Sequence, residues 1–343
     1  MTLKELALHL NLSPTTVSRA LNGYPEVNAE TRRRVMDAAK AMNYAPNLVA
    51  QRLATGRARA VGHVLPLADH QMINPIFAEF ITGASDIYSA AGYDMLLRTV
   101  PQADELDTYR TMAERRAVDG FILHGPLVND SRMPVLRKLG LPVVIHGRTD
   151  TMEADQIYLD VDNREAFGQA TRHLIGLGHT RIALLNGLET MTYARMRRDG
   201  FEAAMAEAGL PLDPALMASR ELTETHGYQV VQRWLDLPDP PTALMASSIL
   251  TAMGMLRAVQ DRGLTLGRDV SIITHDDDMS FLRNEGEVPL FTCTHSSIRA
   301  AGRRCAEMIL HLITHGTDRI TSELWTCDLV EGRSTGPAPH RTT

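Results

Sequence analysis

The sequence predicts two parts of different fold class: a small all-α head at the N-terminus, followed by a longer α/β body built as two lobes. Three short amphipathic helical patterns fill residues 1–45, whereas strand-like apolar runs alternate with helical segments from about residue 60 onward. This alternation continues over residues 60–338, which is too long a stretch for one average hydrophobic core. Two lobes are therefore expected.

The head is expected to contain three packed helices. Each has apolar residues at positions i, i+3, i+4 and i+7, which form one stripe along a helix. The three stripes are Leu3, Leu6, Ala7 and Leu10; Val17, Ala20, Leu21 and Tyr24; and Val35, Ala38, Ala39 and Met42. Asn11 suits the end of the first helix, and Ser13 and Asn28 suit the caps of the next two. Helices this short are unstable alone, so they must pack on one another.

A linker and the body follow the head. Residues 46–59 carry a weak helical pattern that passes into a Gly/Arg-rich segment. Beyond it, helix-like segments such as 163–177, 224–236 and 296–314 separate most of the strand-like runs. The predicted strands are 61–65, 94–98, 120–123, 142–146, 157–161, 181–185, 242–246 and 269–273. Such alternation is typical of open parallel sheets covered by helices.

The two parts differ in charge. Residues 1–59 carry two Lys and seven Arg against four acidic residues, a net charge of +5, whereas the whole chain has −6 and the remainder therefore −11. A basic head on an acidic body indicates that the head alone contacts a polyanion. Chance variation of surface charge is the alternative.

The second predicted helix has a polar face opposite its apolar stripe. Thr15, Ser18, Arg19 and Asn22 recur there at helical spacing. Hydroxyl, amide and guanidinium groups bond to base edges and phosphates, and a tight turn before such a helix places it in the major groove. A solvated face of a small helical bundle is the competing interpretation.

Longer motifs resemble one known family. Residues 2–7 (TLKELA) and 12–22 (LSPTTVSRALN) look like the helix-turn-helix head of the lac-repressor/galactose-repressor (LacI/GalR) family, and the resemblance continues to about residue 338. Asn11 departs from the glycine usual in the family, but asparagine adopts the same backbone conformation. The other matching head and hinge segments are 31–35 (TRRRV), 43–47 (NYAPN) and 48–54 (LVAQRLA).

The resemblance implies four segments: a DNA-binding head (1–45), a hinge helix and linker (46–59), a two-lobed effector-binding and dimerisation domain (60–338) and a disordered tail (339–343). It also implies that Leu53 wedges into a minor-groove step at the operator centre, although an ordinary linker residue remains the alternative. The expected DNA-binding residues are Thr2, Ser13, Pro14, Thr15, Thr16, Ser18, Arg19, Asn22, Asn47, Ala50 and Leu53.

The body resembles the periplasmic-binding-protein-like domain in which this family binds its effector between two lobes. Residues 193–201 (YARMRRDGF) resemble the family's arginine motif, whose first arginine here is Arg195, and Asp276 matches a carboxylate ligand. Together they suit a polyhydroxyl ligand, or alternatively form a structural ion pair. The expected effector-binding residues are Asn74, Phe77, His124, His146, Arg148, Arg195, Ser248 and Asp276.

Two departures from the family concern this site. Thr274 and His275 replace a Gly-Tyr pair before Asp276, and Ser248-Ile249 replaces an Asn-Asp pair. The second change removes one usual sugar-contacting side chain. An α-glucoside or a related disaccharide is the preferred effector class.

The same residues argue against other classes of protein. The composition is that of a soluble globular protein, with 44% hydrophobic and 22% charged residues, and no apolar run or N-terminal signal indicates membrane insertion or export. Cys293, Cys305 and Cys327 are expected to be reduced thiols in a cytoplasmic protein. The histidines near strand ends match no zinc pattern, so neither a metal nor a cofactor is expected.

The expected function is a sequence-specific transcriptional repressor controlled by a sugar, and not an enzyme. A sugar-binding transport protein would lack the basic head, and a sugar-processing enzyme with a DNA-binding domain would need a catalytic motif that we do not find. No heptad tail follows the final segment, which favours a homodimer. The expected partners are double-stranded operator DNA, a small sugar and a second copy of the chain.

Overall fold

The computed structural model describes residues 2–21, 23–44, 56–67, 75–149 and 155–339, and the chain divides into two compact units, 1–59 and 60–343. The predicted hinge residues 46–55 lie outside the described residues. The same holds for five expected contact residues: Asn22, Asn47, Ala50, Leu53 and Asn74.

The first unit contains the three predicted helices: α1 (Leu3–Leu10), α2 (Pro14–Leu21) and α3 (Ala29–Ala41). Thr2 caps α1 reciprocally with Glu5, and Asn11 ends it in the left-handed conformation at a φ of 53°. The buried core of the head comes from the predicted stripes, with Leu6, Val17 and Val35 fully buried. The helical head is confirmed, although Tyr24 lies beyond α2 and is exposed.

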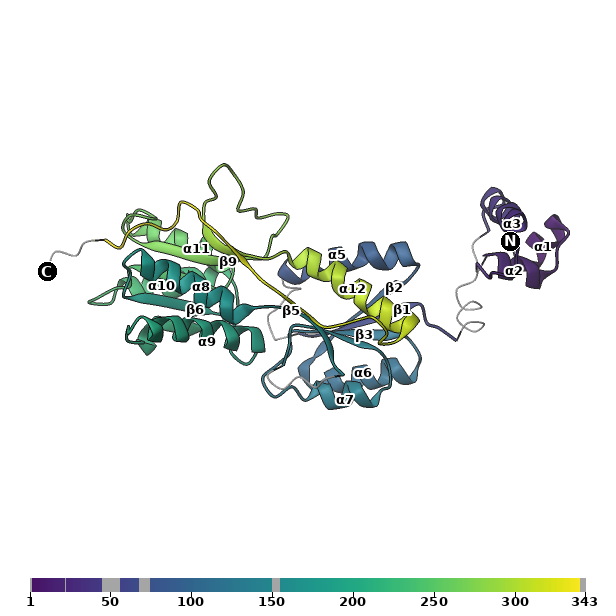
Figure 1. Ribbon diagram of the computed structural model, residues 1–343, viewed down its shortest axis with the longest axis horizontal. Coiled ribbons are helices and arrows are strands. Elements are labelled where there is room, and N and C mark those ends of the chain that lie inside the picture. Colours follow the sequence, from purple (N-terminus) through teal and green to yellow (C-terminus); the bar gives the residue numbers. More distant parts are fainter. Residues whose placement is uncertain (1, 22, 45–55, 68–74, 150–154, 340–343) are drawn as a thin grey trace. The chain divides into compact units, whose positions relative to one another are not determined.

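The second unit begins with lobe 1, whose six-stranded parallel sheet has the order β11-β5-β4-β3-β1-β2 (Figure 1). Its strands are β1 (Ala60–Leu67), β2 (Asp94–Pro101), β3 (Gly120–His124), β4 (Val143–His146), β5 (Ile157–Val161) and β11 (Glu323–Trp325). The helices are α5 (Pro75–Ala91), α6 (Glu105–Glu114), α7 (Arg132–Lys138) and α12 (Ile298–His315), with η1 (Gln102–Asp104) before α6.

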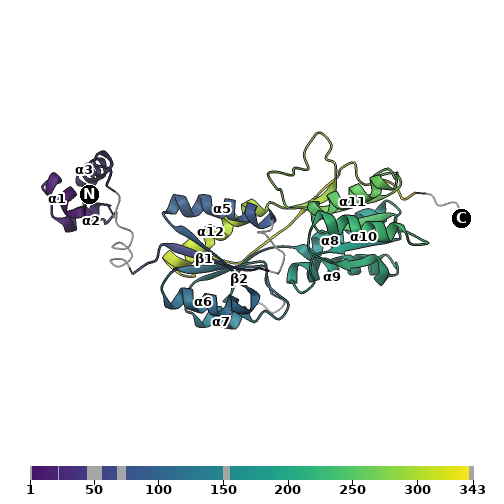
Figure 2. The ribbon, with the colours of Figure 1, turned by 180° about the vertical axis from the view of Figure 1, so that it is seen from behind.

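Lobe 2, whose helices can be followed in Figure 2, contains the second six-stranded sheet. Its order is β12-β10-β9-β8-β6-β7, and among these described strands only β12 is antiparallel to its neighbour. Its strands are β6 (Ile182–Asn186), β7 (Met217–Ser219), β8 (Ala243–Ala246), β9 (Ser271–Asp276), β10 (Thr292–His295) and β12 (Asp328–Val330). Its helices are α8 (Asn163–Gly176), α9 (Thr192–Glu207), α10 (Glu224–Leu235) and α11 (Ile249–Asp261), with η2 (Pro214–Leu216) before β7.

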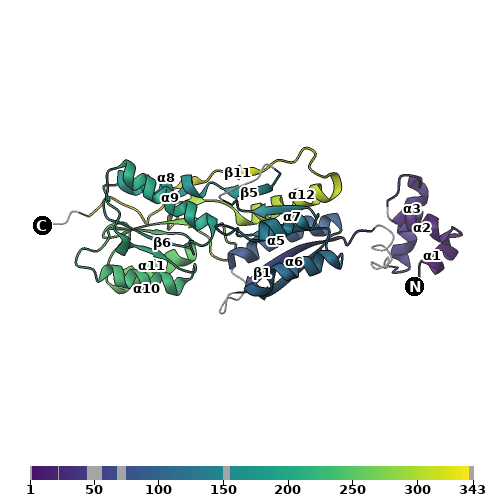
Figure 3. The same ribbon diagram turned by 90° about the horizontal axis from the view of Figure 1, so that it is seen from below.

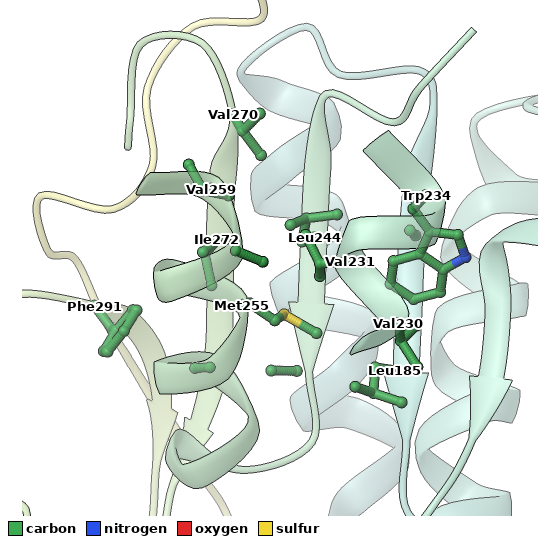
Figure 4. Close-up of a cluster of buried hydrophobic side chains, with 14 of the residues drawn as sticks. Leu185, Val230, Val231, Trp234, Leu244, Met255, Val259, Val270, Ile272 and Phe291 are labelled. Carbon is green, nitrogen blue, oxygen red and sulfur yellow. The ribbon is translucent and has the colours of Figure 1, made fainter. Parts of the chain in front are cut away.

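Helices cover both faces of the lobe 2 sheet, as expected for parallel strands (Figure 3). Because side chains alternate along a strand, Leu184 packs with the α8–α9 side, whereas Leu185 packs with the α10–α11 side. Val231, Leu244, Met255 and Ile272 belong to the second of these clusters (Figure 4). Figure 4 also shows Trp234, whose ring nitrogen donates a hydrogen bond to the backbone oxygen of Ala215 at 2.9 Å.

In lobe 1, α5 and α12 lie side by side (Figure 1). They approach closely because glycines occupy the contact: a Cβ atom at Gly83 would lie 2.1 Å from the backbone oxygen of Arg299. This close packing places the start of α12 beside Glu79 of α5. No described helix is both long enough and apolar enough to cross a membrane.

One strand differs from its predicted bounds in a way that affects the site. The strand expected at 269–273 runs instead from Ser271 to Asp276. Its end is set by pairing with β10, in which His295 lies opposite Asp276. Asp276 is therefore a strand residue, and Asp277 is the first residue beyond the strand.

Candidate functional site

A cavity of about 230 Å³ lies between the two lobes. It is located at the carboxyl ends of the central strands, where open α/β sheets bind their ligands. Lobe 1 contributes Ile76, Gly125, Pro126, His146, Gly147, Asp160, Val161, Ile298 and Ala301. Ser296 and Ser297 come from the segment that leads into α12. Lobe 2 contributes Asn163, Met191, Thr192, Tyr193, Arg197, Leu222, Ser247, His275 and Asp277.

Arg197 is the cavity's arginine and is held rigidly. Its Nε donates to Asn163 Oδ1 at 2.7 Å, and its Nη1 donates to the backbone oxygen of Ser247 at 2.6 Å. The guanidinium carbon lies 4.9 and 5.0 Å from the ring centres of Phe167 and Tyr193. These contacts orient a buried cation, whose remaining N–H groups can meet ligand oxygens.

The expected arginine, Arg195, lies elsewhere. Its side chain is 55% exposed, is 3.5 Å from Asp199 and does not line the cavity. Two residues apart on a helix face nearly opposite directions, so Arg195 and Arg197 cannot both face the cavity. The rotation of α9 about its own axis is set by its close contact with α8 at Gly200, where a Cβ atom would lie 2.0 Å from the backbone oxygen of Arg164.

The carboxyl group that lines the cavity is one residue away from the expected one, for a related reason. His275 and Asp277 line the cavity, whereas Asp276 does not, because successive side chains point to opposite faces at the end of β9. Oδ1 of Asp276 accepts a hydrogen bond from the backbone N–H of Asp278 at 2.9 Å. Burial raises the pKa of Asp277 to about 7, although Arg197 opposes this shift.

His275 is a fixed, neutral part of the lobe 2 wall. Its ring nitrogens lie 2.9 Å from Thr294 Oγ1 and 3.1 Å from Ser296 Oγ. Burial lowers the pKa of His275 well below its usual value, and the cation of Arg197 adds to this effect. The ring therefore offers hydrogen bonding without a charge.

Ser247 lines the cavity in place of the expected Ser248. Ser247 Oγ donates to Asn186 Oδ1 at 2.7 Å, and its backbone oxygen holds Arg197. Ser248 is instead the N-cap of α11, where its hydroxyl accepts a hydrogen bond from the backbone N–H of Leu250 at 3.2 Å. Capping of α11 therefore accounts for the serine at position 248.

The lobe 1 wall contains His146, which lines the cavity as expected. Burial lowers the pKa of His146 to about 4, so the ring is neutral. The Phe80 ring centre lies 4.5 Å from that of His146. His124 and Phe77 lie in the layer behind this wall, with their ring centres 4.8 Å apart.

Arg148 contacts a carboxylate that lines the cavity. It does not line the cavity, but its Nε lies 3.0 Å from Oδ2 of Asp160, which does. Burial raises the pKa of Asp160 to about 6, and Arg148 opposes that shift. Sequence reasoning missed Asp160, which sits inside an apolar strand-like run with no local signal of a site.

In the head, the described members of the expected DNA-contact set lie on the surface. Ser13, Pro14, Thr15 and Arg19 are exposed, and Thr16 and Ser18 are partly exposed. Of these, Thr15, Ser18 and Arg19 lie on the face of α2 opposite the buried Val17 and Ala20. Ser13 Oγ also accepts a hydrogen bond from the backbone N–H of Thr16 at 3.0 Å. Thr2 is exposed at the N-cap of α1.

The described parts of the chain contain no group of three or more His, Cys, Asp or Glu side chains arranged to hold a metal ion. The chemistry available in the cavity is therefore that of a fixed guanidinium, carboxyl groups, hydroxyls and neutral imidazoles. Such a set can recognise hydroxyl groups through several directional hydrogen bonds.

Comparison with protein-family models gives two matches that together cover most of the chain. Residues 2–47 match the model of bacterial regulatory proteins of the lacI family. Residues 58–332 match the model of periplasmic binding proteins and the sugar-binding domain of the LacI family.

Curated proteins and solved structures show similarity over nearly the full length. The HTH-type transcriptional regulator AglR of Rhizobium meliloti (strain 1021) is 45% identical over 340 residues, covering 99% of this chain and 95% of that protein. RafR of Escherichia coli, also an HTH-type transcriptional regulator, is 33% identical over 329 residues, which is 95% of this chain and 96% of RafR.

Among solved structures, a complex of the transcriptional regulator CelR with cellobiose has a TM-score of 0.70 at 28% identity, covering 97% of this chain and 99% of that one. A lac repressor dimer bound to operator has a TM-score of 0.81 at 22% identity, covering 98% and 99% of the two chains, and shows likeness of fold.

Proposed function

Because the chain belongs to the LacI family of bacterial regulatory proteins, we propose that it is a repressor whose binding to operator DNA is controlled by a neutral sugar in the cavity between its lobes. Its relatives are transcriptional regulators, and the body matches a sugar-binding domain. The proposal includes a homodimer, a near-palindromic operator and a cytoplasmic location.

The proposed DNA-binding surface is the polar face of α2. It carries Thr15, Ser18 and Arg19 opposite buried Val17 and Ala20, and the head has a net charge of +5. Phosphate contacts from such a head release counterions, so operator affinity should fall steeply with salt. The hinge and the Leu53 wedge remain part of the proposal, since they rest on the family motif.

The observation that carries the sugar assignment is that Arg197 and Asp277 line the same cavity from lobe 2. A fixed guanidinium donates to hydroxyl oxygens, and a carboxyl group accepts from hydroxyl hydrogens. Asp160 and Asp277 both line the cavity, so an anionic sugar would meet two carboxyl groups for one arginine. We therefore propose a neutral sugar, with an α-glucoside or related disaccharide preferred.

Control of the operator requires two states of the body that the sugar binds unequally. Several contacts connect the lobes and can change between such states. The hydroxyl of Thr192 donates to the backbone oxygen of Pro126 at 3.0 Å, and the backbone N–H of Val128 donates to the backbone oxygen of Thr190 at 2.9 Å. Glu79 accepts hydrogen bonds from Ser280 in lobe 2.

A panel of neutral mono- and disaccharides, together with glucose 6-phosphate and glucuronate, tests the proposal by thermal shift and by fluorescence anisotropy with operator DNA. At 100 times its dissociation constant, a bound sugar adds about 2.7 kcal/mol of stability. We expect at least one neutral sugar to raise the melting temperature and to change operator affinity, without being consumed. Preference for the anionic sugars, or no response to any sugar, would contradict the proposal.

A further inference from the structure

Three side chains of lobe 1, two of them buried, form a hydrogen-bonded chain that the proposed function does not use. The Tyr88 hydroxyl of α5 lies 3.2 Å from Nε2 of His63 on β1. Nδ1 of His63 lies 2.9 Å from Nε2 of His124 on β3. Tyr88 is 1% exposed and His63 is fully buried, so water does not compete for the bond between them, whereas His124 is partly exposed.

The direction of the hydrogen bonds follows from Tyr88. A buried hydroxyl needs a partner for its proton, and the partner that the described residues offer is Nε2 of His63. Tyr88 therefore donates to His63. Burial lowers the pKa of His63 to about 3 and that of His124 well below its usual value, so each ring carries one proton.

The remaining protons are then fixed. Since Nε2 of His63 accepts, its proton lies on Nδ1 and is donated to Nε2 of His124. His124 must carry its own proton on Nδ1. That nitrogen is buried and has no hydrogen-bond partner among the described residues.

This unused N–H group belongs to a residue one layer behind the cavity wall, since His124 itself does not line the cavity. His124 immediately precedes Gly125, which lines the cavity. The His124 ring centre is 5.9 Å from that of His146, which also lines it, and the two residues are paired neighbours at the ends of β3 and β4. A buried donor without a partner gains more than an exposed one when an acceptor arrives.

We propose that Tyr88 and His63 are positioning residues that hold His124 as an N–H donor toward the effector site. The ligand then places an oxygen with a free lone pair here, contacting Nδ1 directly or through one water molecule. An N–H group at the same place, as in an amino sugar, is disfavoured because it would meet another donor. This inference rests on the proposed function for the identity of the site.

The first test needs no sugar. In the full-length protein with ¹⁵N-labelled histidine, the ring nitrogens of His124 are assigned by their loss in His124→Asn. We expect protonated Nδ1 and unprotonated Nε2 in the wild type. In Tyr88→Phe, which removes only the donated proton at the end of the chain, His124 should shift toward the Nε2-protonated form.

Tyr109→Phe is the matched control. Tyr109 is also fully buried in lobe 1, but its hydroxyl has no hydrogen-bond partner among the described residues, and the ring it packs against is that of Phe121. The control should keep the wild-type histidine signals. A wild-type His124 protonated on Nε2, or equal changes in both tyrosine variants, would overturn the inference whatever the sugars do.

The second test measures function with named probes. Maltose, cellobiose and glucosamine are titrated into wild type, Tyr88→Phe and Tyr109→Phe, while operator affinity is measured without sugar. We expect Tyr88→Phe to lower the affinity for the tighter-binding disaccharide about tenfold. The ratio of that affinity to the affinity for glucosamine should therefore fall. Operator affinity measured without sugar should be unchanged. Sugar affinities that match those of Tyr109→Phe would overturn the inference. No binding of any panel sugar, with the wild-type histidine signature present, would overturn the proposed function alone.

Discussion

The two walls of the cavity differ in how they can recognise a ligand. Lobe 2 presents a cation, Arg197, that is fixed by two short hydrogen bonds, and a carboxyl group, Asp277. Lobe 1 presents the neutral ring of His146 beside Ile76, with aromatic rings packed behind. The difference indicates that the fixed cation of lobe 2 supplies directional, charge-assisted bonds, whereas lobe 1 combines the shape and neutral ring of His146 with the single carboxyl group of Asp160.

The largest expected effect comes from the lobe 2 arginine. Arg197→Met should lower sugar affinity at least a hundredfold, about 3 kcal/mol, because it removes charge-assisted bonds to the ligand and frees Asn163 and Ser247. Calorimetric titration of the best panel sugar measures this change.

Arg195→Met is the control for the same motif, since its side chain is exposed and paired only with Asp199. It should leave sugar affinity within about twofold of the wild type, as exposed ion pairs contribute little. If Arg195→Met abolished sugar binding while Arg197→Met did not, the assignment of the arginine from the cavity geometry would be wrong.

One residue of each wall, His146 in lobe 1 and Asp277 in lobe 2, should respond to pH in opposite directions. His146 has a folded pKa of about 4, below its unfolded value, so unfolding takes up a proton between about pH 4 and 6.5 and stability falls as the pH falls. Asp277 has a folded pKa of about 7, above its unfolded value, so unfolding releases a proton between about pH 4 and 7 and stability rises as the pH falls. Each group contributes about 1.4 kcal/mol per pH unit where only one state is protonated.

Urea unfolding between pH 5 and 6 separates the two contributions. His146→Asn should flatten the rise of unfolding free energy with pH, and Asp277→Asn should make that rise steeper. Slopes that move in the same direction in both variants would show that the walls do not differ in this way.

These corrections show what local sequence can and cannot predict. The head helices and their ends were predictable, because apolar spacing and the caps Asn11 and Asn28 are local signals. The residues expected to bind the effector fall in segments that line the cavity, but Arg195, Asp276 and Ser248 lie one or two positions from the lining residues. Whether Asp276 or Asp277 faces the cavity depends on how far β9 pairs with β10, and the phase of α9 depends on its crossing with α8 at Gly200. Both are tertiary contacts without a local signature.

A contact between the two lobes is expected to give a smaller effect. Glu79 of α5 accepts hydrogen bonds from the backbone N–H and hydroxyl of Ser280, three residues after Asp277, and is paired with Arg299 at 2.7 Å. Glu79→Gln should shift the sugar concentration for half-maximal operator response about three- to tenfold, because it weakens the contact between the lobes.

Asp86→Asn is the matched control for Glu79→Gln. Asp86 pairs with Arg303 and so joins the same two helices, α5 and α12, without contacting lobe 2. Operator anisotropy against sugar concentration should be unchanged in this variant. Equal shifts in both variants would assign the effect to packing of the two helices instead of to the contact between the lobes.

The smallest expected effect concerns the neighbouring serines at the end of β8. Ser248→Ala should lower the free energy of unfolding by about 1 kcal/mol, since it removes the N-cap of α11, and should leave sugar affinity unchanged because the side chain does not line the cavity. Ser247→Ala removes a cavity hydroxyl bonded to Asn186 and should weaken sugar binding several-fold. Melting curves and calorimetric titration of both variants check this. A loss of sugar affinity confined to Ser248→Ala would return that residue to the effector site and reverse the assignment along this part of lobe 2.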